Sequence, residues 1–308
     1  MARWTAADIP DQAGRQVVVT GANSGLGLAT TRELARGGAS VVMACRNADK
    51  GRRAVEDVRR DVPSADVRFE SLDLADLSSV QAFARRLGSA LDRLDLLVNN
   101  AGVMAPPRRE TVDGFESQLG TNHLGHFALT GRLLALLSSG RVVTLSSIMH
   151  RIGRLKLDDL QMRHRYVNWL AYGQSKLANL MFAIELQRRA TAAGTPLLSL
   201  AAHPGYSATN LQLAGPATAW ERWGLLAMNK TVAQTADEGA LPTLYAATMP
   251  GIPGGSFIGP DGFMEMRGHP RLTTGAGRAY DEDAARRLWD QSEQLTGVRY
   301  EFPVTAVR

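Results

Sequence analysis

The sequence predicts an α/β fold in which a doubly wound parallel sheet is covered by helices on both faces. Short β-branched runs alternate six times with windows of 3.6-residue apolar spacing. The runs are apolar throughout instead of at every second position, which is typical of parallel strands buried on both faces. In such a sheet we expect the ligand site at the carboxyl ends of the strands.

The predicted strands follow one another along the first two thirds of the chain. They are 16–20 (QVVVT), 39–44 (ASVVMA), 66–72 (DVRFESL), 94–100 (LDLLVNN), 141–147 (RVVTLSS) and 196–203 (PLLSLAAH). The helical spacing between strands is shown by Leu77, Val80, Phe83, Ala84 and Leu87. After residue 205, Gly, Pro and Trp interrupt the alternation of strand and helix patterns. A last helix is predicted near 281–296.

The whole chain is expected to form a single domain. Its cofactor-binding and catalytic core spans about 14–205, and about 206–308 form a substrate lobe with a C-terminal sheet and helix extension. The 308 residues are 44% hydrophobic, which is enough to bury a large core.

Composition also bears on location. The single cysteine, Cys45, excludes an intrachain disulfide, and the residues after Met1 lack the apolar core of a secretion signal. No apolar run approaches the ~18 residues that cross a bilayer. We therefore expect a soluble protein in a reducing, cytoplasmic setting, with no membrane span.

The net charge of +5 comes from 35 basic and 30 acidic residues. Arginine doublets at 52–53, 59–60 and 85–86 lie among acidic neighbours on helical patterns, which favours solvated helix faces over nucleic-acid binding. Four of the 35 basic residues are lysines, which leaves 31 arginines; the lysines are Lys50, Lys156, Lys176 and Lys230.

A glycine-rich turn follows the first predicted strand. TGANSGLG places Gly21, Gly25 and Gly27 between strand and helix, where glycines let the backbone approach a pyrophosphate. The N-terminus of the next helix favours that negative charge. The spacing T-G-x-x-x-G-x-G differs from G-x-G-x-x-G, and a plain glycine-rich turn is the alternative.

The end of the second predicted strand, VVMACRN, bears on the choice of cofactor. NAD-preferring dinucleotide-binding proteins commonly carry an acid there for the ribose 2′-hydroxyl, whereas this chain has Cys45 and Arg46. A guanidinium can pair bidentately with phosphate oxygens, so Arg46 favours NADP(H) over NAD(H), with Lys50 as a helper one turn later. Arg46 as an ordinary loop arginine is the alternative.

AYGQSK places Tyr172 and Lys176 on one face of a predicted helix, because positions i and i+4 are neighbours there. An isolated tyrosine has a pKa of about 10, and a nearby cation lowers it by roughly 1 to 3 units. Such a pair can protonate the oxygen of a carbonyl that accepts a hydride. Taken alone, the motif is weak and is more often a surface pair.

Six motifs occur together in order: TGANSGLG, NNAG (99–102), TNHLGHF (121–127), LSS (145–147), YGQSK (172–176) and HPG (203–205). With them the chain resembles the classical short-chain dehydrogenase/reductase family over about residues 14–260. ACRN, TNHLGHF and YGQSKLAN are most similar to its retinol-dehydrogenase-like group, and protochlorophyllide reductases are similar too. We expect no counterpart of the membrane-anchoring N-terminal segment that many animal members carry.

The resemblance implies a Rossmann fold and an NADP(H)-dependent oxidoreductase acting on an aldehyde, ketone or secondary alcohol. It makes Tyr172 the acid/base, while Lys176 lowers the tyrosine pKa and binds the nicotinamide ribose. Ser147 hydrogen-bonds the carbonyl oxygen, with Ser146 as the alternative. Asn122 holds a water that continues the proton path to Lys176.

The resemblance also implies cofactor contacts. They are Gly21, Asn23, Ser24, Gly25, Leu26, Gly27, Arg46, Lys50, Asp73, Leu74, Asn100, Ala101, Gly102, Tyr172, Lys176, Pro204, Gly205 and Thr209. Asp73 and Leu74 would flank the adenine, and Asn100 to Gly102 would line the cofactor. Pro204, Gly205 and Thr209 would cover the nicotinamide side. Asp73 as an N-terminal helix residue is the alternative.

Two segments bear on specificity. The gap of 25 residues from Ser147 to Tyr172 is longer than in many classical members, and the mixed pattern of 148–170 predicts a short helical excursion beside the pocket. Trp220, Trp223 and Met228 form either an apolar lid or a core-packed lobe. A lid would favour an apolar or bulky substrate.

The remaining residues bear on metal binding, on alternative functions and on assembly. His123 and His126 lack Cys, Asp or Glu at ligand spacing, so no metal site is predicted, and His203 is expected to be a hydrogen-bonded strand-end residue. An NADP(H)-binding regulatory protein without turnover is the alternative function. A nucleotide-sugar epimerase is disfavoured, since its usual G-x-x-G-x-x-G turn does not occur. The resemblance implies a homodimer or homotetramer through the helices next to the Tyr-Lys helix, with a monomer left open.

Overall fold

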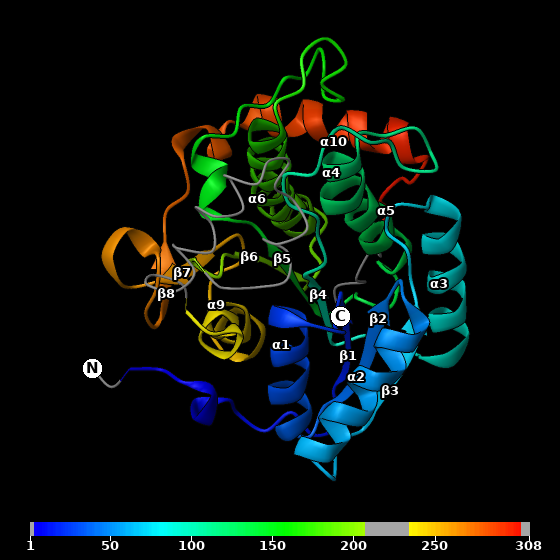
Figure 1. The fold of residues 1–308 in the computed structure, drawn as a ribbon, viewed down its shortest axis with the longest axis vertical. Coiled ribbons are helices and arrows are strands. Elements are labelled where there is room, and N and C mark those ends of the chain that lie inside the picture. The colour runs from blue at the N-terminus through cyan, green and yellow to red at the C-terminus, as the bar shows by residue number, and fades with distance from the viewer. Residues whose placement is uncertain (1–2, 207–233, 303–308) are drawn as a thin grey trace.

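The computed structural model describes residues 3–206 and 234–302. In these two ranges eight strands form one sheet in the order β3-β2-β1-β4-β5-β6-β7-β8 (Figure 1). The strands are β1 Gln16–Thr20, β2 Ser40–Cys45, β3 Val67–Ser71, β4 Leu96–Asn99, β5 Arg141–Leu145, β6 Leu198–Ala202, β7 Phe257–Pro260 and β8 Pro270–Thr273. All neighbours pair in parallel except β7 and β8, which are antiparallel. The predicted doubly wound α/β fold is confirmed.

Helices connect the strands. The α-helices are α1 Gly25–Arg36, α2 Ala48–Asp61, α3 Leu77–Ala90, α4 Ser117–Leu119, α5 Gly125–Arg132, α6 Asn168–Ala192, α9 Ala236–Thr248 and α10 Glu282–Thr296. Short 3-10 turns are η1 Ala6–Asp8, η3 Ile148–Arg151, η4 Phe263–Glu265 and η5 Gly277–Tyr280, and a π-helical turn, η2, spans Gly120–Leu124. None of the helices in the described ranges combines the length and apolar character that a bilayer-spanning segment needs.

Side chains alternate along β1 between two buried layers. Val17 and Val19 face a core formed with α1, α2 and α9, whereas Val18 faces a core formed with α3, α5, α6 and α10. All three valines are fully buried. This two-sided burial explains why the strands are apolar at successive positions.

The C-terminal elements lack a clear period in the sequence. α9 contains Pro242 within the helix, although a capping box joins Thr235 and Glu238 at its start. β7 and β8 extend the sheet beyond β6 and carry prolines at Pro260 and Pro270. The helix predicted near 281–296 is α10, which starts one residue later at Glu282.

The expected helical excursion between Ser147 and Tyr172 is largely wrong. Helical structure there is confined to the single 3-10 turn η3, and turns and irregular chain lead from it to α6 at Asn168. This segment is held by side chains instead of by a helical ladder; the Gln174 side-chain amide, for example, donates to the Leu160 carbonyl at 2.9 Å.

Helix α10 lies across α5 and α6 (Figure 1). Its Trp289 is 2% exposed and stacks on Phe182 of α6 at 5.8 Å between ring centroids. The same indole packs edge-on against Phe127 of α5 at 5.0 Å, and the Arg189 guanidinium lies 4.4 Å from its ring. Aromatic packing therefore fixes α10 on these two helices.

Candidate active site

The glycine-rich turn joins the carboxyl end of β1 to α1. Gly21 (φ +66°) and Gly25 (φ +53°) adopt the left-handed conformation that favours glycine. A Cβ on Gly27 would overlap the Gly21 carbonyl and lie 2.5 Å from Asn100 Nδ2. Among the described residues, the N-cap Ser24 makes no side-chain capping bond. The turn thus leaves backbone N–H groups free for an anion, and it fits a cofactor pyrophosphate.

The loop after β4 is pinned to the end of β1. The backbone N–H groups of Asn100 and Ala101 both donate to Thr20 Oγ1 at 2.9 Å, and Asn100 Nδ2 donates to the Thr20 carbonyl at 2.7 Å. The predicted residues Asn100, Ala101 and Gly102 therefore lie beside the glycine-rich turn. Thr20 holds them there, a role that the sequence signalled only as the first letter of TGANSGLG.

Arg46 follows β2 at the same edge of the sheet. The Cys45 sulfur, just before it, receives hydrogen bonds from the backbone of Ala22 and Asn23, while burial raises the pKa of this thiol to about 11. Arg46 and Lys50 are exposed, and no described residue pairs with either side chain. Arg46 therefore follows a residue that contacts the glycine-rich turn, and its guanidinium has no partner among the described residues.

Asp73 and Leu74 follow β3. The Asp73 carboxylate accepts the Ala75 N–H at 2.9 Å and closes a turn before α3. The N-cap of that helix is Asp76, which accepts from Ser78 and Ser79, so the alternative of Asp73 as a helix residue is wrong. Leu74 is only 6% exposed and packs in the core.

Tyr172 and Lys176 lie in the first turns of α6 and are 5% and 4% exposed. The Ser147 side chain, at the end of the chain leading from β5, hydrogen-bonds the Tyr172 hydroxyl. The Ser146 hydroxyl points elsewhere and donates to the Lys176 carbonyl at 2.7 Å. The structure thus brings Ser147, and not Ser146, to the tyrosine.

The tyrosine pKa departs from the expectation. Burial raises the pKa of Tyr172 to about 12, against the opposite effect of the Ser147 hydrogen bond. Burial also lowers the pKa of Lys176 to about 8. Lys176 Nζ donates to the Leu145 carbonyl at 3.1 Å and stands 5.7 Å from the centroid of the tyrosine ring. The expected lowering is wrong for this structure, because desolvation of the buried hydroxyl outweighs the Ser147 hydrogen bond.

Asn122 lies in the π-helical turn η2 and is fully buried. Its Oδ1 accepts the Val103 N–H at 2.7 Å, and its Nδ2 donates to the Val103 carbonyl at 3.0 Å and to Ser175 Oγ at 2.9 Å. A Cβ on Gly102 would lie 3.0 Å from Asn122 Oδ1 and 3.6 Å from Lys176 Nζ. Asn122 and Lys176 therefore flank the same glycine.

His126 belongs to this network, although no sequence motif predicted a role for it. Its Nδ1 donates to the Asn122 carbonyl at 2.9 Å, and its Nε2 lies 2.9 Å from Thr20 Oγ1. Burial lowers the pKa of His126 to about 4, so the ring is neutral. The four-residue spacing of Asn122 and His126 was the available signal.

The other two histidines discussed above have structural partners. His123 Nε2 lies 2.9 Å from Ser292 Oγ of α10. His203 follows β6, is fully buried and contacts Glu265 at 3.1 Å, as expected of a hydrogen-bonded strand-end residue. Within the described ranges, no group of three or more His, Cys, Asp or Glu side chains is arranged to hold a metal ion.

Pro204 and Gly205 lie at the carboxyl end of β6. Gly205 has φ +67°, and a Cβ there would overlap the Met266 carbonyl. The Gln234 side chain donates to the Pro204 carbonyl. Thr209, Trp220, Trp223 and Met228 lie outside the described residues.

The segment that leads into α6 reaches Tyr172. The Tyr166 hydroxyl donates to the Pro106 carbonyl at 2.9 Å, and Asn168 Nδ2 donates to the Ala105 carbonyl at 3.2 Å. The Trp169 ring meets the Tyr172 ring edge-on, 6.4 Å between centroids. The segment is thus fixed to the loop after β4 and ends at Tyr172.

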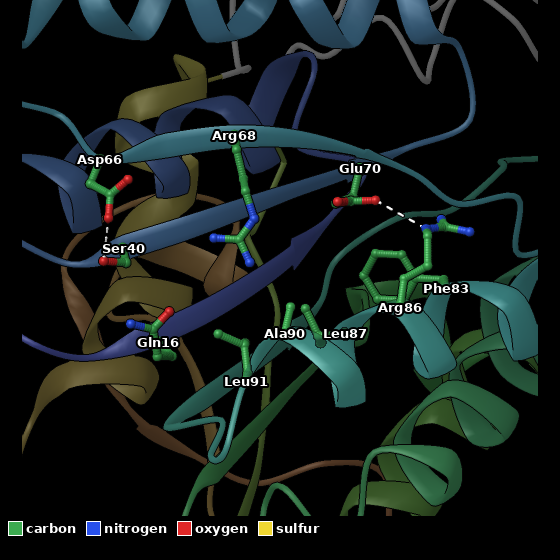
Figure 2. A pocket seen from close by; sticks show the side chains of 10 residues that line it. All are labelled: Gln16, Ser40, Asp66, Arg68, Glu70, Phe83, Arg86, Leu87, Ala90 and Leu91. Atoms are coloured by element: carbon green, nitrogen blue, oxygen red, sulfur yellow. Dashed lines mark hydrogen bonds and ion pairs between the residues drawn. The ribbon is translucent and has the colours of Figure 1, made fainter.

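A hollow of about 320 Å³ lies away from these residues (Figure 2). It is lined by Gln16, Ser40, Asp66, Arg68, Glu70, Phe83, Arg86, Leu87, Ala90 and Leu91. Figure 2 shows Asp66 paired with Ser40 and Glu70 paired with Arg86. It shares no residue with the predicted site.

Comparison with known proteins agrees with this geometry. A family model described as short chain dehydrogenase matches residues 15–218. The chain belongs to the short-chain dehydrogenase family. It is 39% identical to retinol dehydrogenase 12 of Mus musculus, over 94% of this chain and 88% of that one. It is 41% identical to polyprenol dehydrogenase of the same species, over 94% and 86%. These relatives place this oxidoreductase in the retinol-dehydrogenase-like group.

Solved structures of the family give the same fold. A crystal structure of an uncharacterized protein from Mycobacterium Paratuberculosis is 50% identical, with a TM-score of 0.81 over 98% of this chain and all of that one. A candidate gluconate 5-dehydrogenase from Beutenbergia cavernae, with bound NADP, is 27% identical, with a TM-score of 0.60 over 77% and 91%. The short-chain dehydrogenase architecture of this chain is therefore that of nicotinamide-dependent oxidoreductases.

Proposed function

We propose that this protein is an NADP(H)-dependent oxidoreductase that transfers a hydride between nicotinamide and an apolar aldehyde, ketone or alcohol. The observation that carries the proposal is the convergence of Ser147, Tyr172 and Lys176 at the carboxyl ends of the strands, next to a glycine-rich turn open to an anion. A protein that only binds a cofactor has no need of this proton-transfer group.

Ser147, Tyr172 and Lys176 each have a separate part in the proposed reaction. A bound nicotinamide supplies or accepts the hydride. Ser147 Oγ accepts the Met149 N–H at 3.3 Å, and its hydroxyl hydrogen, which faces Tyr172, can donate to a substrate oxygen bound there. Tyr172, neutral because burial raises its pKa to about 12, gives its proton to the same oxygen during reduction. Lys176 then supplies positive charge beside the tyrosine ring.

The cofactor's phosphates would be held by the backbone of Ser24 to Gly27, and its ribose by Tyr172 and Lys176. Arg46, exposed and without a partner in the described part of the chain, supports a 2′-phosphate and hence NADP(H). The NADP in the Beutenbergia cavernae structure is a further support.

Arg46→Asp is expected to reverse the cofactor preference. Removing the guanidinium and adding an acid should repel the 2′-phosphate and accept hydrogen bonds from a 2′-hydroxyl, so kcat/KM for NADPH relative to NADH falls about tenfold or more. Steady-state kinetics with both cofactors measures the ratio. Arg53→Asp, the same charge change on an exposed position of α2, is the control. An unchanged ratio in Arg46→Asp would remove this arginine from the site.

The substrate is proposed to be apolar. Trp169 places an indole edge against Tyr172, which supports an apolar wall at the reacting centre. The names of two relatives point the same way, because retinol and polyprenol are both long apolar alcohols. We further propose that the protein works in the cytoplasm.

Loss of NADPH absorbance with a panel of carbonyl compounds tests the function. Retinal, a long-chain polyprenal and an apolar ketone are expected to be reduced with higher kcat/KM than glyceraldehyde, a small polar aldehyde. Binding of NADPH is followed in parallel by its fluorescence. Tight NADPH binding without turnover of any panel member would favour the alternative of a regulatory binding protein.

A further inference from the structure

His150 lies three residues after Ser147 and is completely buried. Its Nδ1 is 2.6 Å from the Ser147 carbonyl oxygen, which also accepts the His150 backbone N–H at 3.0 Å. On the other side of the ring, Nε2 is 3.0 Å from the Ala276 backbone nitrogen. The imidazole therefore bridges the catalytic serine and the segment before η5.

The partners fix the tautomer of this ring. The Ala276 N–H can only donate, so Nε2 must accept, and the ring hydrogen lies on Nδ1. The Ser147 carbonyl can only accept, which matches a donor at Nδ1. Burial lowers the pKa of His150 to about 4, so the neutral form persists. Both bonds are satisfied by this one form of the side chain.

C-terminal elements hold the ring on its remaining sides. The Phe257 ring of β7 meets it edge-on at 5.4 Å between centroids. A Cβ on Gly275 would lie 3.4 Å from its Nε2, so the glycine permits close approach. The titratable and charged groups that face it are Arg151 on its own turn, His203 after β6 and Glu265 in η4.

We propose that His150 is a positioning residue that sets the orientation of Ser147 toward Tyr172 through its Nδ1–H bond to the Ser147 carbonyl. The proposal rests on the catalytic role given to Ser147 under the proposed function. Fixing this carbonyl fixes the extended backbone at Ser147, whose side chain accepts from Met149 and hydrogen-bonds Tyr172. Through His150, the sheet extension after β6 supports the reacting centre.

Two substitutions separate the bonds of the ring. In His150→Asn the side-chain amide nitrogen occupies the place of Nδ1 and can still donate to Ser147. In His150→Gln the amide reaches the place of Nε2 and can accept from Ala276, while the bond to Ser147 is lost. With retinal and NADPH, we expect kcat of His150→Asn to stay within about threefold of wild type and that of His150→Gln to fall about 10- to 100-fold.

A second readout distinguishes positioning from mere stability. The Ser147 hydrogen bond lowers the pKa of Tyr172, so losing it should move the alkaline limb of alcohol oxidation to higher pH in His150→Gln only. NADPH affinity, measured by fluorescence, should be the same in both variants. Equal losses of kcat in the two variants, or a normal kcat and unshifted limb in His150→Gln, would overturn the proposal.

Two further measurements test the tautomer of His150 and the proposed function separately. If His150→Gln does not fold, ¹⁵N NMR of the wild-type imidazoles still tests the geometry. The His150 resonance is assigned as the one that disappears in His150→Asn, and it should belong to an Nδ1–H tautomer at neutral pH. An Nε2–H tautomer would contradict the proposal. Wild-type turnover, and its loss in Tyr172→Phe, show separately whether the proposed function holds.

Discussion

Tyr172→Phe is expected to lower kcat for retinal reduction by about 10²- to 10⁴-fold, the usual contribution of a general acid. The substitution removes only the hydroxyl that Ser147 hydrogen-bonds, while the ring keeps its place against Trp169. NADPH affinity and thermal stability should therefore change little. Steady-state kinetics, NADPH fluorescence titration and a thermal melt measure the three quantities.

The same tyrosine sets the pH dependence. Because burial raises the pKa of Tyr172 to about 12, its acid form is complete at neutral pH, and reduction should vary little there. Alcohol oxidation needs the phenolate and should rise with pH on the alkaline side. Tyr172→Phe should lose this rise.

Tyr245→Phe is the matched control, because its ring packs edge-on against Trp4, away from the site. It should keep wild-type kcat. Substantial turnover in Tyr172→Phe would mean that another group delivers the proton, and the assignment of Tyr172 would be wrong.

Lys176→Arg is expected to be far from conservative, with kcat reduced about 10²-fold, the usual cost of misplacing a group at a reacting centre by about 1 Å. The charge is kept, but the buried ammonium sits close to Gly102 and donates to the Leu145 carbonyl. A planar guanidinium is wider and offers its donors in a different geometry. Kinetics and a thermal melt separate lost turnover from lost folding.

Lys156→Arg provides the comparison for this change. Lys156 is exposed in the segment before α6, so the same exchange there should alter neither kcat nor stability. Near-normal activity in Lys176→Arg would mean that Tyr172 and Lys176 form a structural pair without a role in proton transfer.

Most of the fold was predictable, because buried parallel strands leave a direct mark on sequence. β1 has the predicted bounds, and β2 to β6 begin and end within two residues of prediction. After residue 233, α10 was located to within one residue, whereas α9, β7 and β8 were not, because the proline in α9 and the prolines in β7 and β8 hide their periods. The segment after Ser147 was misjudged because side-chain bonds, which leave no periodic mark, hold it in place.

The residues of the candidate site were predictable from the sequence, but the pKa values of their side chains were not. Ser147, Tyr172 and Lys176 lie together, yet the pKa of the tyrosine rises instead of falling, because spacing along a helix does not reveal how deeply both groups are buried. His126 and His150 were missed for a similar reason. Each joins a nearby backbone carbonyl to a group far along the chain, and that distant partner is defined only by folding.

Helix α10 has a consequence for assembly. The family resemblance places subunit contacts on the helices beside the Tyr-Lys helix, but here Trp289 and the rest of α10 already cover α5 and α6 from within the same chain. A second copy that docked on these helices would have to contact them where α10 leaves them open. Within this chain, Trp289 shields one side of the helix that carries Tyr172 and Lys176.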